Sequence, residues 1–202
     1  MYDNNFYDQI TQRAIESARE IVPIVLKMVD TPKSVVDFGC GRGSWLSVFE
    51  EHGVQDILGL DGDYVNNYLP CLEGDKFKTV DLSQPISLSQ KYDLCVTLEV
   101  VEHIPSEYED VFFDSICASS DNILFSGAVP GQGGVNHVNE RWHTHWAQKL
   151  SARGYYVTGD LRYQIWNNPN IENWYKQNLL FASKGASFGQ PPLDLIHPNN
   201  WR

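Results

Sequence analysis

The order of hydrophobic and polar positions predicts short buried strands alternating with helices along most of the chain. Residues 7–28 carry apolar side chains at helical spacing, and Pro23 within them is expected to kink or split that helix. A run of apolar residues bounded by turn-forming residues is typical of a buried strand. Such runs predict strands at residues 35–38, 57–60, 77–80, 92–98, 122–126, 155–158 and 178–182.

Helices are expected between these strands, at residues 44–52, 106–118 and 142–153. Gly53 and Gly154 follow two of them, in a position that ends helices. Ser106 and Glu109 have the spacing of a capping box. Strands alternating with helices indicate a parallel α/β sheet, which binds its ligands at the carboxyl ends of the strands. Residues 184–202 are rich in proline and asparagine and are predicted to form an irregular tail or a link to another domain.

Composition and charge narrow the classes of partner. A chain of 202 residues with 42% hydrophobic residues suits one domain with a substantial core. Its 15 basic and 26 acidic side chains give a net charge of −11, and such a surface does not attract a polyphosphate backbone. DNA and long RNA are therefore not expected as partners, and a small neutral or cationic molecule or a neutral glycan is favoured.

Neither a membrane partner nor a disulfide framework is expected. The longest apolar run near the N-terminus, residues 21–26, contains Pro23 and is far too short to span a bilayer, and the first residues do not resemble a signal peptide. The four cysteines, at positions 40, 71, 95 and 117, lack Cys-x-x-Cys spacing, which favours reduced structural thiols and a cytoplasmic location.

A glycine-rich loop follows the first predicted strand and opens a helix at Ser44. Glycines at positions 39, 41 and 43 allow a tight turn and the close approach of a ligand, as in dinucleotide-binding enzymes. Asp37 precedes the loop, where its carboxylate would repel the pyrophosphate of a dinucleotide but suits a ligand with an ammonium group. This favours S-adenosylmethionine, which carries a zwitterionic end beside a cationic sulfonium. A nicotinamide-dependent dehydrogenase is the alternative.

The segment Val36-Asp-Phe-Gly-Cys-Gly-Arg-Gly43 resembles the first motif of the class I S-adenosylmethionine-dependent methyltransferases. The resemblance implies a Rossmann-like α/β fold, with a seven-stranded, mostly parallel sheet, helices on both faces and an antiparallel C-terminal hairpin. Residues 1–183 would form this single domain, in which residues 1–30 are a helical cover over the cofactor. Residues 184–202 would be the irregular tail.

Acidic residues after the next strands extend the expected cofactor site. Asp61 lies twenty residues beyond Gly41, the interval at which a carboxylate on the neighbouring strand reaches a ribose diol. An aspartate before a glycine is also an ordinary turn residue. The resemblance implies that Asp81 and Leu82 hold the adenine. The complete set of expected cofactor-binding residues is Asp37, Gly39, Cys40, Gly41, Gly43, Trp45, Asp61, Gly62, Asp63, Asp81, Leu82 and Glu99.

A second group of functional candidates, Glu99-Val-Val-Glu102-His103, follows the fourth strand. Two carboxylates and an imidazole suit Mg²⁺ or Mn²⁺, and the histidine leaves Zn²⁺ open. The pattern resembles ubiquinone-pathway O-methyltransferases and small-RNA 2′-O-methyltransferases, in which Glu-x-x-Glu-His and a later histidine bind a metal. His137 would be the later histidine here. The alternatives are a purely structural Glu-His pair and His103 as a metal-free general base.

A hydroxyl acceptor would explain the use of a metal, since a bound cation positions the hydroxyl and stabilises the developing alkoxide. His143 and His145 are candidate bases if they face the pocket, and surface residues of a helix otherwise. The C-terminal third is rich in aromatic residues, which stack on sugar rings or fill a core. They are Trp142, Trp146, Tyr163, Trp166, Trp174 and Tyr175.

The segments 130–134, 137–142 and 174–180 resemble small methyltransferases that accompany glycan-building genes. That resemblance implies a sugar or glycan hydroxyl as the acceptor, and a glycan-building system as the source of any partner protein or domain. Two alternatives stay open. One is a metal-free methyltransferase acting on a nitrogen or a carboxylate of a small metabolite, and the other is a non-catalytic cofactor-binding subunit.

Overall fold

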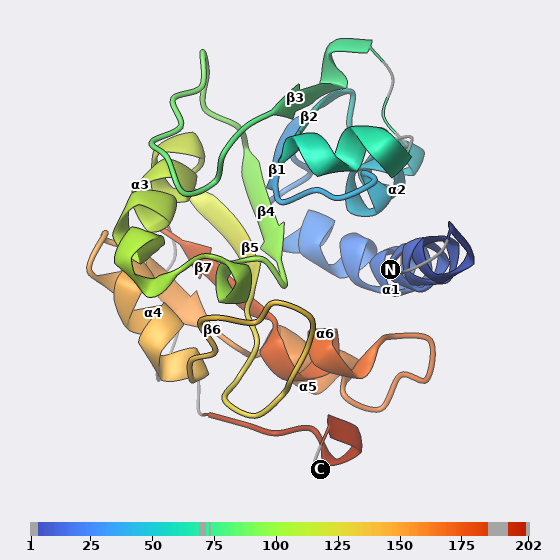
Figure 1. Cartoon of the computed structure of the whole chain (residues 1–202), viewed down its shortest axis with the longest axis vertical. Coiled ribbons are helices and arrows are strands. Elements are labelled where there is room, and N and C mark those ends of the chain that lie inside the picture. Colours follow the sequence, from blue (N-terminus) through green and yellow to red (C-terminus); the bar gives the residue numbers. More distant parts are fainter. Residues whose placement is uncertain (1–3, 69–71, 73, 186–193, 201–202) are drawn as a thin grey trace.

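The computed structural model of the chain describes residues 4–68, 72, 74–185 and 194–200. It contains one seven-stranded sheet with helices packed around it (Figure 1). The strands are β1 (Ser34–Phe38), β2 (Asp56–Asp61), β3 (Phe77–Thr79), β4 (Leu94–Leu98), β5 (Asn122–Ser126), β6 (Tyr156–Thr158) and β7 (Leu180–Ser183). The α-helices are α1 (Asn4–Met28), α2 (Ser44–Glu51), α3 (Glu109–Ser119), α4 (His143–Ser151), α5 (Leu161–Ile165) and α6 (Asn173–Asn178). Short 3₁₀ helices are η1 (Asp63–Tyr68), η2 (Gly74–Lys76), η3 (Val101–His103), η4 (Ser106–Tyr108) and η5 (Pro198–Asn200).

The strand order in the sheet is β3-β2-β1-β4-β5-β7-β6. Strands β1 to β5 pair in parallel, whereas β7 pairs antiparallel with both β5 and β6. The predicted mostly parallel sheet with an antiparallel C-terminal pair is thus confirmed. The chain builds outward from β1 in one direction through β2 and β3, and in the other through β4 and β5. A crevice therefore forms where the carboxyl ends of β1 and β4 meet, at the switch in strand order.

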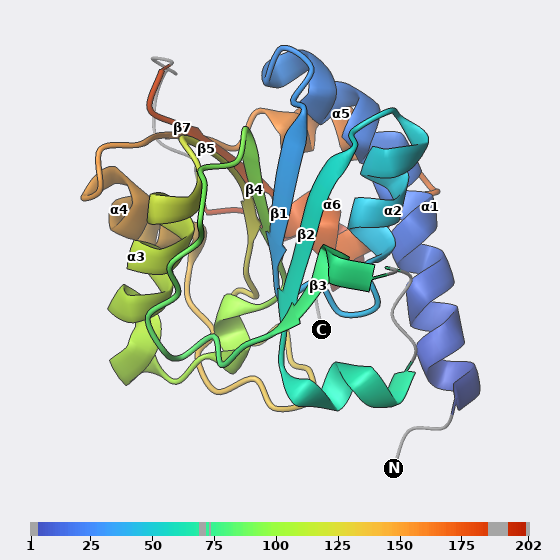
Figure 2. The same ribbon diagram turned by 90° about the horizontal axis from the view of Figure 1, so that it is seen from above.

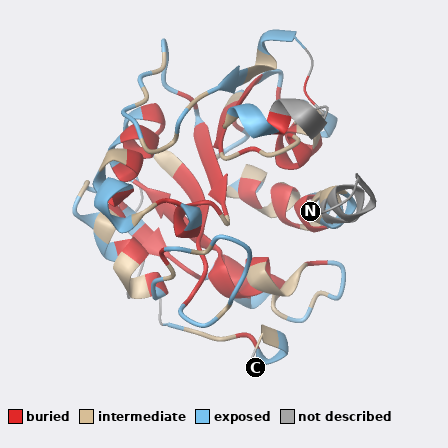
Figure 3. Cartoon of the chain, viewed as in Figure 1, coloured by how far each residue is buried: buried red, intermediate tan, exposed pale blue. Residues whose placement is uncertain are grey.

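Two apolar clusters form the core, one on each face of the sheet. Adjacent residues of β1 point to opposite faces, so Val35 joins the cluster under α1, α2, α5 and α6 and Val36 joins the cluster under α3 and α4. Figure 2 shows α1 and α2 on one side of the sheet and α3 and α4 on the other. The buried residues gather along the strands and the helix faces turned toward them (Figure 3).

Pro23 was predicted to kink or split the first helix, and α1 runs as one helix from Asn4 to Met28, so the split does not occur. A proline inside a helix removes one backbone donor and costs about 3 kcal/mol. Ile21, Val22 and Val25 on either side of it are fully buried in the core. Burial of each such side chain contributes about 1.5–3 kcal/mol. Tertiary packing therefore outweighs the local penalty.

Two predicted element boundaries are also wrong. Ser106 lies in η4 and does not cap α3, which begins at Glu109 without a side-chain cap. The Glu109 carboxylate instead accepts a hydrogen bond from Asn139 Nδ2 at 2.8 Å. Strand β7 begins at Leu180, because Asn178 still belongs to α6. That shift moves Asn178 from the predicted strand to a helix end beside the cavity described below.

Residues 194–200 return to the body of the domain. Asp194 accepts hydrogen bonds at 2.9 Å from the backbone nitrogen and from the hydroxyl of Thr144, and so caps the N-terminus of α4 from 50 residues away. The backbone nitrogen of His197 donates to Gln177 Oε1 at 2.8 Å. This part of the predicted tail is therefore docked on α4 and α6.

The described cysteines Cys40, Cys95 and Cys117 are buried free thiols, and Cys71 lies outside the described residues. Burial raises the pKa of Cys117 to about 11, so the neutral thiol is its form near pH 7. Among the described residues, no helix is long and apolar enough to cross a membrane.

Candidate functional site

A cavity of about 990 Å³ opens at the carboxyl ends of β1 to β4. Each of these strands supplies part of its wall: Gly39 follows β1, Asp61 ends β2, Asp81 follows β3 and Glu99 follows β4. This is the sheet edge at which open α/β folds bind ligands. The predicted cofactor residues that line the cavity are Gly39, Gly41, Asp61, Gly62, Asp63, Asp81, Leu82 and Glu99.

The cavity wall is acidic. Among the described residues that line it, the ionisable side chains are four carboxylates, one phenol and one imidazole. They are Asp61, Asp63, Tyr64, Asp81, Glu99 and His103. Carboxylates concentrated in a cleft repel phosphate and attract cations. The wall therefore suits a ligand with positive or no net charge.

The loop after β1 has the tight geometry that its glycines predict. Gly39 adopts φ +83°, and a Cβ atom there would lie 2.3 Å from a methyl group of Val100. Its backbone nitrogen donates to Leu60 O at 2.7 Å, which ties the loop to β2. Gly43 adopts φ +81° at the start of α2. Larger residues at these two positions would strain the backbone and move the cavity wall.

Four predicted cofactor residues are not among those that line the cavity: Asp37, Cys40, Gly43 and Trp45. Asp37 is only 3% exposed, and burial together with the charge of Asp61 raises its pKa. The Trp45 ring packs edge-on against Tyr175 with the ring centroids 5.1 Å apart, and its Nε1 donates to the Tyr175 hydroxyl at 3.3 Å. These residues shape the loop and the core behind the cavity wall.

Asp61 joins the loop after β1 to the end of β2. Its Oδ2 accepts from the backbone nitrogen of Gly41 at 2.7 Å, and its Oδ1 accepts from that of Gly62 at 2.7 Å. The hydroxyl of Tyr64, on η1, also donates to Oδ1. Two donors therefore already occupy the oxygen that a ribose hydroxyl would reach, and one of them is a side chain that is 60% exposed.

At the end of β3, Asp81 Oδ1 accepts hydrogen bonds from the backbone nitrogen and the hydroxyl of Ser83, at 2.9 and 2.6 Å. These bonds lower the pKa of Asp81. Asp81, Leu82 and Ser83 all line the cavity. The structure thus brings the β3 end next to the β2 end, as an adenosine spanning both would require.

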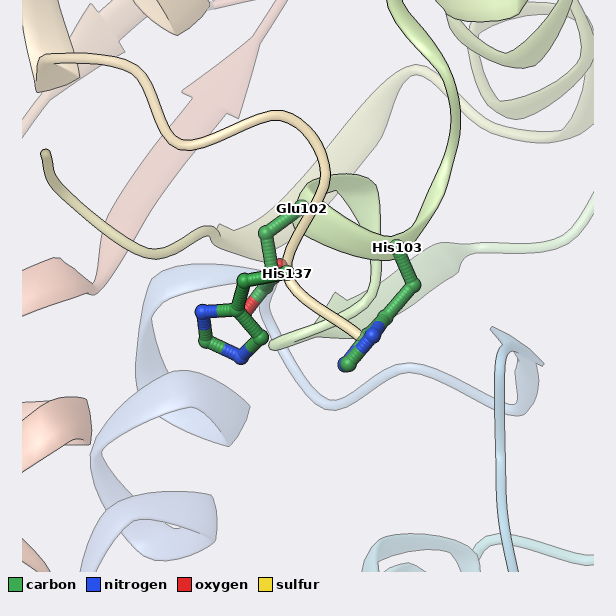
Figure 4. A group of neighbouring side chains, drawn as sticks. All are labelled: Glu102, His103 and His137. Carbon is green, nitrogen blue, oxygen red and sulfur yellow. The ribbon is translucent and has the colours of Figure 1, made fainter. Parts of the chain in front are cut away.

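Glu102, His103 and His137 come together as a group that could hold a metal ion, with one candidate ligand atom from each lying within 4.8 Å of the others (Figure 4). Glu102 and His103 belong to η3, whereas His137 comes from the long loop between β5 and α4. That loop is pinned to η3 because the backbone nitrogens of Val138 and Asn139 donate to Glu102 O at 2.9 and 3.0 Å.

The hydrogen bonds around this group leave ligand atoms free. Both carboxylate oxygens of Glu102 are buried without a hydrogen-bond partner, and burial followed by the charge of Glu99 raises the Glu102 pKa. His103 Nδ1 lies 3.2 Å from Asn136 O, and His137 Nδ1 lies 2.9 Å from Glu140 Oε1. When each Nδ1 carries the proton, each Nε2 presents a lone pair, the form in which histidine binds metals.

Glu140 is itself held in place by the glycine-rich loop. Its carboxylate accepts from the backbone nitrogens of Gly131 and Gly133 at 2.7 and 2.8 Å. Gly134 leaves room for the His137 ring, because a Cβ atom there would lie 2.2 Å from His137 Nε2. The glycines of this loop therefore fix the carboxylate that orients His137.

Glu99, the fourth predicted ligand, is not part of the three-residue group. Burial raises its pKa, and hydrogen bonds from Asn178, Ser126 and Gln132 act in the opposite direction. Its carboxylate is bonded by the amides of Asn178 and Gln132 and lies in the cavity wall.

His143 and His145 are not among the described residues that line the cavity. His143 is fully buried with Nε2 3.4 Å from Asn178 Oδ1, and burial lowers its pKa to about 4. His145 Nε2 lies 3.1 Å from Glu109 Oε2, in the contact between α4 and α3. The structure therefore does not bring these two predicted bases into the site.

The C-terminal aromatic residues do not gather around the cavity either. Trp146 is fully buried and stacks on Phe113 at 6.0 Å between ring centroids, while Trp142 and Tyr163 are exposed. None of the six predicted aromatic residues is among those that line the cavity. The predicted sugar platform is thus not formed by these side chains in the cavity.

Sequence reasoning missed several residues of the site. Tyr64 lines the cavity, Glu140 holds His137, and Gln132 and Asn178 hold Glu99. For Gln132 and Glu140 a signal existed, since both flank the glycines next to His137. Nothing in the sequence marks Asn178, which is 79 residues from Glu99 along the chain.

The model of one protein family, the methyltransferase domain, matches residues 10–160 of the chain. Comparison with curated protein sequences gives no match.

Among solved structures, the methyltransferase domain of bacterial CtHen1-C is similar, with a TM-score of 0.62 and 19% identity over 86% of this chain and 100% of that one. Magnesium protoporphyrin IX methyltransferase from Synechocystis PCC 6803, with S-adenosylhomocysteine bound, gives a TM-score of 0.60 and 18% identity over 91% of this chain and 90% of that one. The plantazolicin methyltransferase BpumL, in complex with a pentazolic desmethylPZN analogue and S-adenosylhomocysteine, gives a TM-score of 0.57 and 15% identity over 88% of this chain and 87% of that one. At these identities the likeness concerns the fold.

Proposed function

The chain belongs to the methyltransferase domain family and is an S-adenosylmethionine-dependent methyltransferase, and from this premise we propose that it methylates a hydroxyl oxygen with the help of a divalent metal. The observation that carries the proposal is the Glu102 carboxylate, which is buried without a hydrogen-bond partner and has a candidate ligand atom of His103 and one of His137 within 4.8 Å. The proposed acceptor is a sugar or glycan hydroxyl.

The cavity supports one orientation of the methyl donor. Asp81 and Leu82 after β3 are suited to the adenine, and the Asp61 carboxylate at β2 is suited to the ribose hydroxyls. The methionine end would then extend over the loop at Gly39 toward Glu99 and β4. S-adenosylmethionine supplies a methyl group on a sulfonium, and in-line displacement breaks its C–S bond as the C–O bond to the acceptor forms.

The three-residue group fits a divalent ion. Glu102 would supply an oxygen ligand, and His103 and His137 would each supply the ring nitrogen that is not bonded to Asn136 O or Glu140 Oε1. Such a ligand set is compatible with Mn²⁺, Mg²⁺ or Zn²⁺. Bound there, the ion would act as a Lewis acid that positions the acceptor hydroxyl and lowers the cost of releasing its proton to solvent water. Glu140 would maintain the His137 tautomer throughout.

The apolar part of the cavity wall supports an uncharged acceptor. Its lining includes Val100, Ile104, Pro105 and Val135, together with His103. Among the described residues that line the cavity there is no lysine or arginine. A phosphate-bearing acceptor would meet several carboxylates without a basic side chain of the described wall to offset them. A sugar ring, with apolar C–H faces and neutral hydroxyls, meets no such penalty. The substrates named for the similar structures are chemically diverse, so the acceptor is inferred from this wall alone.

A metal-free route is the second candidate, because His103 lines the cavity and burial lowers its pKa. The neutral imidazole could then accept the hydroxyl proton at Nε2. Chelation separates the two routes, since only the first loses activity with the metal.

Turnover with a panel of sugars, neutral glycans and simple alcohols tests the proposal, with S-adenosylhomocysteine formation as the readout. We expect activity on at least one hydroxyl acceptor, a loss of tenfold or more with EDTA, and recovery with Mn²⁺. His137→Ala should abolish the metal-dependent part, whereas His145→Ala, a matched change away from the cavity, should retain it. Activity that is insensitive to EDTA would support the His103 route. Turnover of amines or carboxylates alone would contradict O-methylation, and cofactor binding without turnover would favour a non-catalytic subunit.

Tyr64→Phe is expected to strengthen S-adenosylhomocysteine binding about threefold to tenfold, as measured by calorimetry. The Tyr64 hydroxyl occupies Asp61 Oδ1, so a ribose hydroxyl must displace it at a cost of about 1 kcal/mol. Tyr163→Phe, at a similarly exposed tyrosine away from the cavity, should leave the affinity unchanged. A weaker complex of the Tyr64 variant would instead show that the hydroxyl contacts the ligand.

A further inference from the structure

Glu99 is held by amide groups from two segments that are remote in the sequence. Asn178 Nδ2 lies 3.0 and 3.2 Å from its two carboxylate oxygens, and Gln132 Nε2 donates to Oε2 at 2.9 Å. Gln132 belongs to the loop between β5 and α4, and Asn178 ends α6. We call Gln132 and Asn178 the amide clamp.

The backbone of Glu99 is fixed as well. The residue adopts φ +54°, a left-handed conformation that is uncommon for residues with a Cβ atom and is strained. Its backbone nitrogen is held by Ser126, with Oγ at 3.0 Å and O at 3.2 Å on β5. A strained residue at the end of a central strand that is fixed at both backbone and side chain is typical of a functional position.

A third amide sets the orientation of the clamp. Gln177 is fully buried, and its Nε2 donates to Gln132 Oε1 and to Asn178 Oδ1, both at 3.0 Å. Because an amide oxygen only accepts and an amide nitrogen only donates, these bonds turn both clamp nitrogens toward Glu99. Gln177 Oε1 accepts in turn from the backbone nitrogen of His197, so the docked segment 194–200 locks the arrangement.

Neutral amides hold a carboxylate without cancelling its charge. A lysine or arginine in the same place would neutralise the ionised Glu99 carboxylate. Amide donors oppose the rise in the Glu99 pKa that burial causes, and they leave the charge of the ionised carboxylate to act on a ligand. Glu99 lines the cavity next to the loop after β1, beyond the ends of β2 and β3. With the adenine at β3 and the ribose at β2, the sulfur of the methyl donor falls at this position.

We infer that Glu99, held by the amide clamp, distinguishes the cationic methyl donor from its neutral thioether product, and that Gln132, Asn178 and Gln177 are positioning residues for it. The inference rests on the proposed function. A fixed negative charge attracts the sulfonium of S-adenosylmethionine and has no such attraction for the sulfur of S-adenosylhomocysteine. The product therefore leaves more readily than the donor, and a fresh donor replaces it.

The test is calorimetry of both compounds with metal-free protein in EDTA, which yields the ratio of the two dissociation constants, product over donor. Glu99→Gln is expected to lower this ratio about tenfold by weakening donor binding, with product binding changed less than threefold. Gln132→Met and Asn178→Leu should each lower it about threefold. Asn122→Leu is the matched control, because the Asn122 amide bonds Asp93 O at the opposite end of the sheet and the ratio should stay unchanged.

Equal weakening of donor and product in Glu99→Gln would overturn the inference and leave the proposed function standing. If folded Gln132→Met keeps the wild-type ratio of dissociation constants, the amide clamp does not contribute to the discrimination between donor and product. Gln132 lies on a loop and is only partly buried, so Gln132→Met is expected to fold. It tests the clamp even if the variant at the buried Asn178 does not fold. Wild-type protein that binds neither compound would overturn both the proposed function and the inference.

Discussion

Asp61→Ala is expected to weaken S-adenosylhomocysteine binding about 100-fold. Hydrogen bonds to a charged group contribute about 1.5–3 kcal/mol each, and a ribose diol offers two such bonds to this carboxylate. Their loss, offset in part by release of the Tyr64 hydroxyl, amounts to about 3 kcal/mol, or two factors of ten. Calorimetric titration of the variant measures this directly.

The same substitution also removes the acceptor for the backbone nitrogens of Gly41 and Gly62, so stability should fall by about 1–2 kcal/mol in urea unfolding. Asp56→Ala is the matched control, because Asp56 begins β2 and its exposed carboxylate accepts from Gln90 at 2.7 Å. It should leave ligand binding intact. If binding and stability of the Asp61 variant fall by the same free energy, Asp61 organises the loop and does not contact the ribose.

Glu102→Gln should have opposite effects on metal binding and on stability. The variant lacks the charged member of the three-residue group, so the rise in Tm with Mn²⁺ that we expect of the wild type should be absent. In EDTA, however, the variant should be more stable than the wild type by about 1 kcal/mol or more, since a buried carboxylate without hydrogen bonds is costly. In a domain of this size that is a shift of about 3 °C.

Thermal unfolding with and without Mn²⁺ measures both effects. Glu107→Gln, which changes an exposed glutamate five residues along the chain, should alter neither. A retained Mn²⁺ shift would exclude Glu102 as a ligand. Lower stability in EDTA would mean that the Glu102 carboxylate has a favourable partner in the folded protein, which contradicts the structural role proposed for it as a free ligand.

Local patterns predicted the strands well where burial on both faces makes a continuous apolar run, as in β4 and β5. They failed where distant packing competes with a local preference. Pro23 does not break α1 because its neighbours are buried in the core, and Ser106 does not cap α3 because the chain there forms η4. The predicted strand included Asn178 because an apolar run follows it directly, and no residue type in the sequence marks the end of α6 there.

Chain connectivity explains why part of the cofactor site was predictable. In a parallel sheet every strand ends at the same edge, so acids at the last position of β2 or shortly after β3 and β4 must lie close together. Asp61, Asp81 and Glu99 follow this rule and line one cavity. Asp37 does not, since it lies within β1 and is buried at the strand end behind the loop.

The sequence by itself determined the α/β architecture, the glycine loop and the pairing of Glu102 with His103, because each depends on residues close together along the chain or on the shared edge of the sheet. For the third member of the group, His137, the sequence offered only a resemblance to a metal-binding pattern, and the tertiary structure is what brings this histidine to the other two residues. It does so because the loop of His137 is pinned to Glu102 O, while His143 and His145 lie on α4 away from the cavity. The amide clamp on Glu99 likewise depends on contacts between residues 33 and 79 positions apart, which no local pattern encodes.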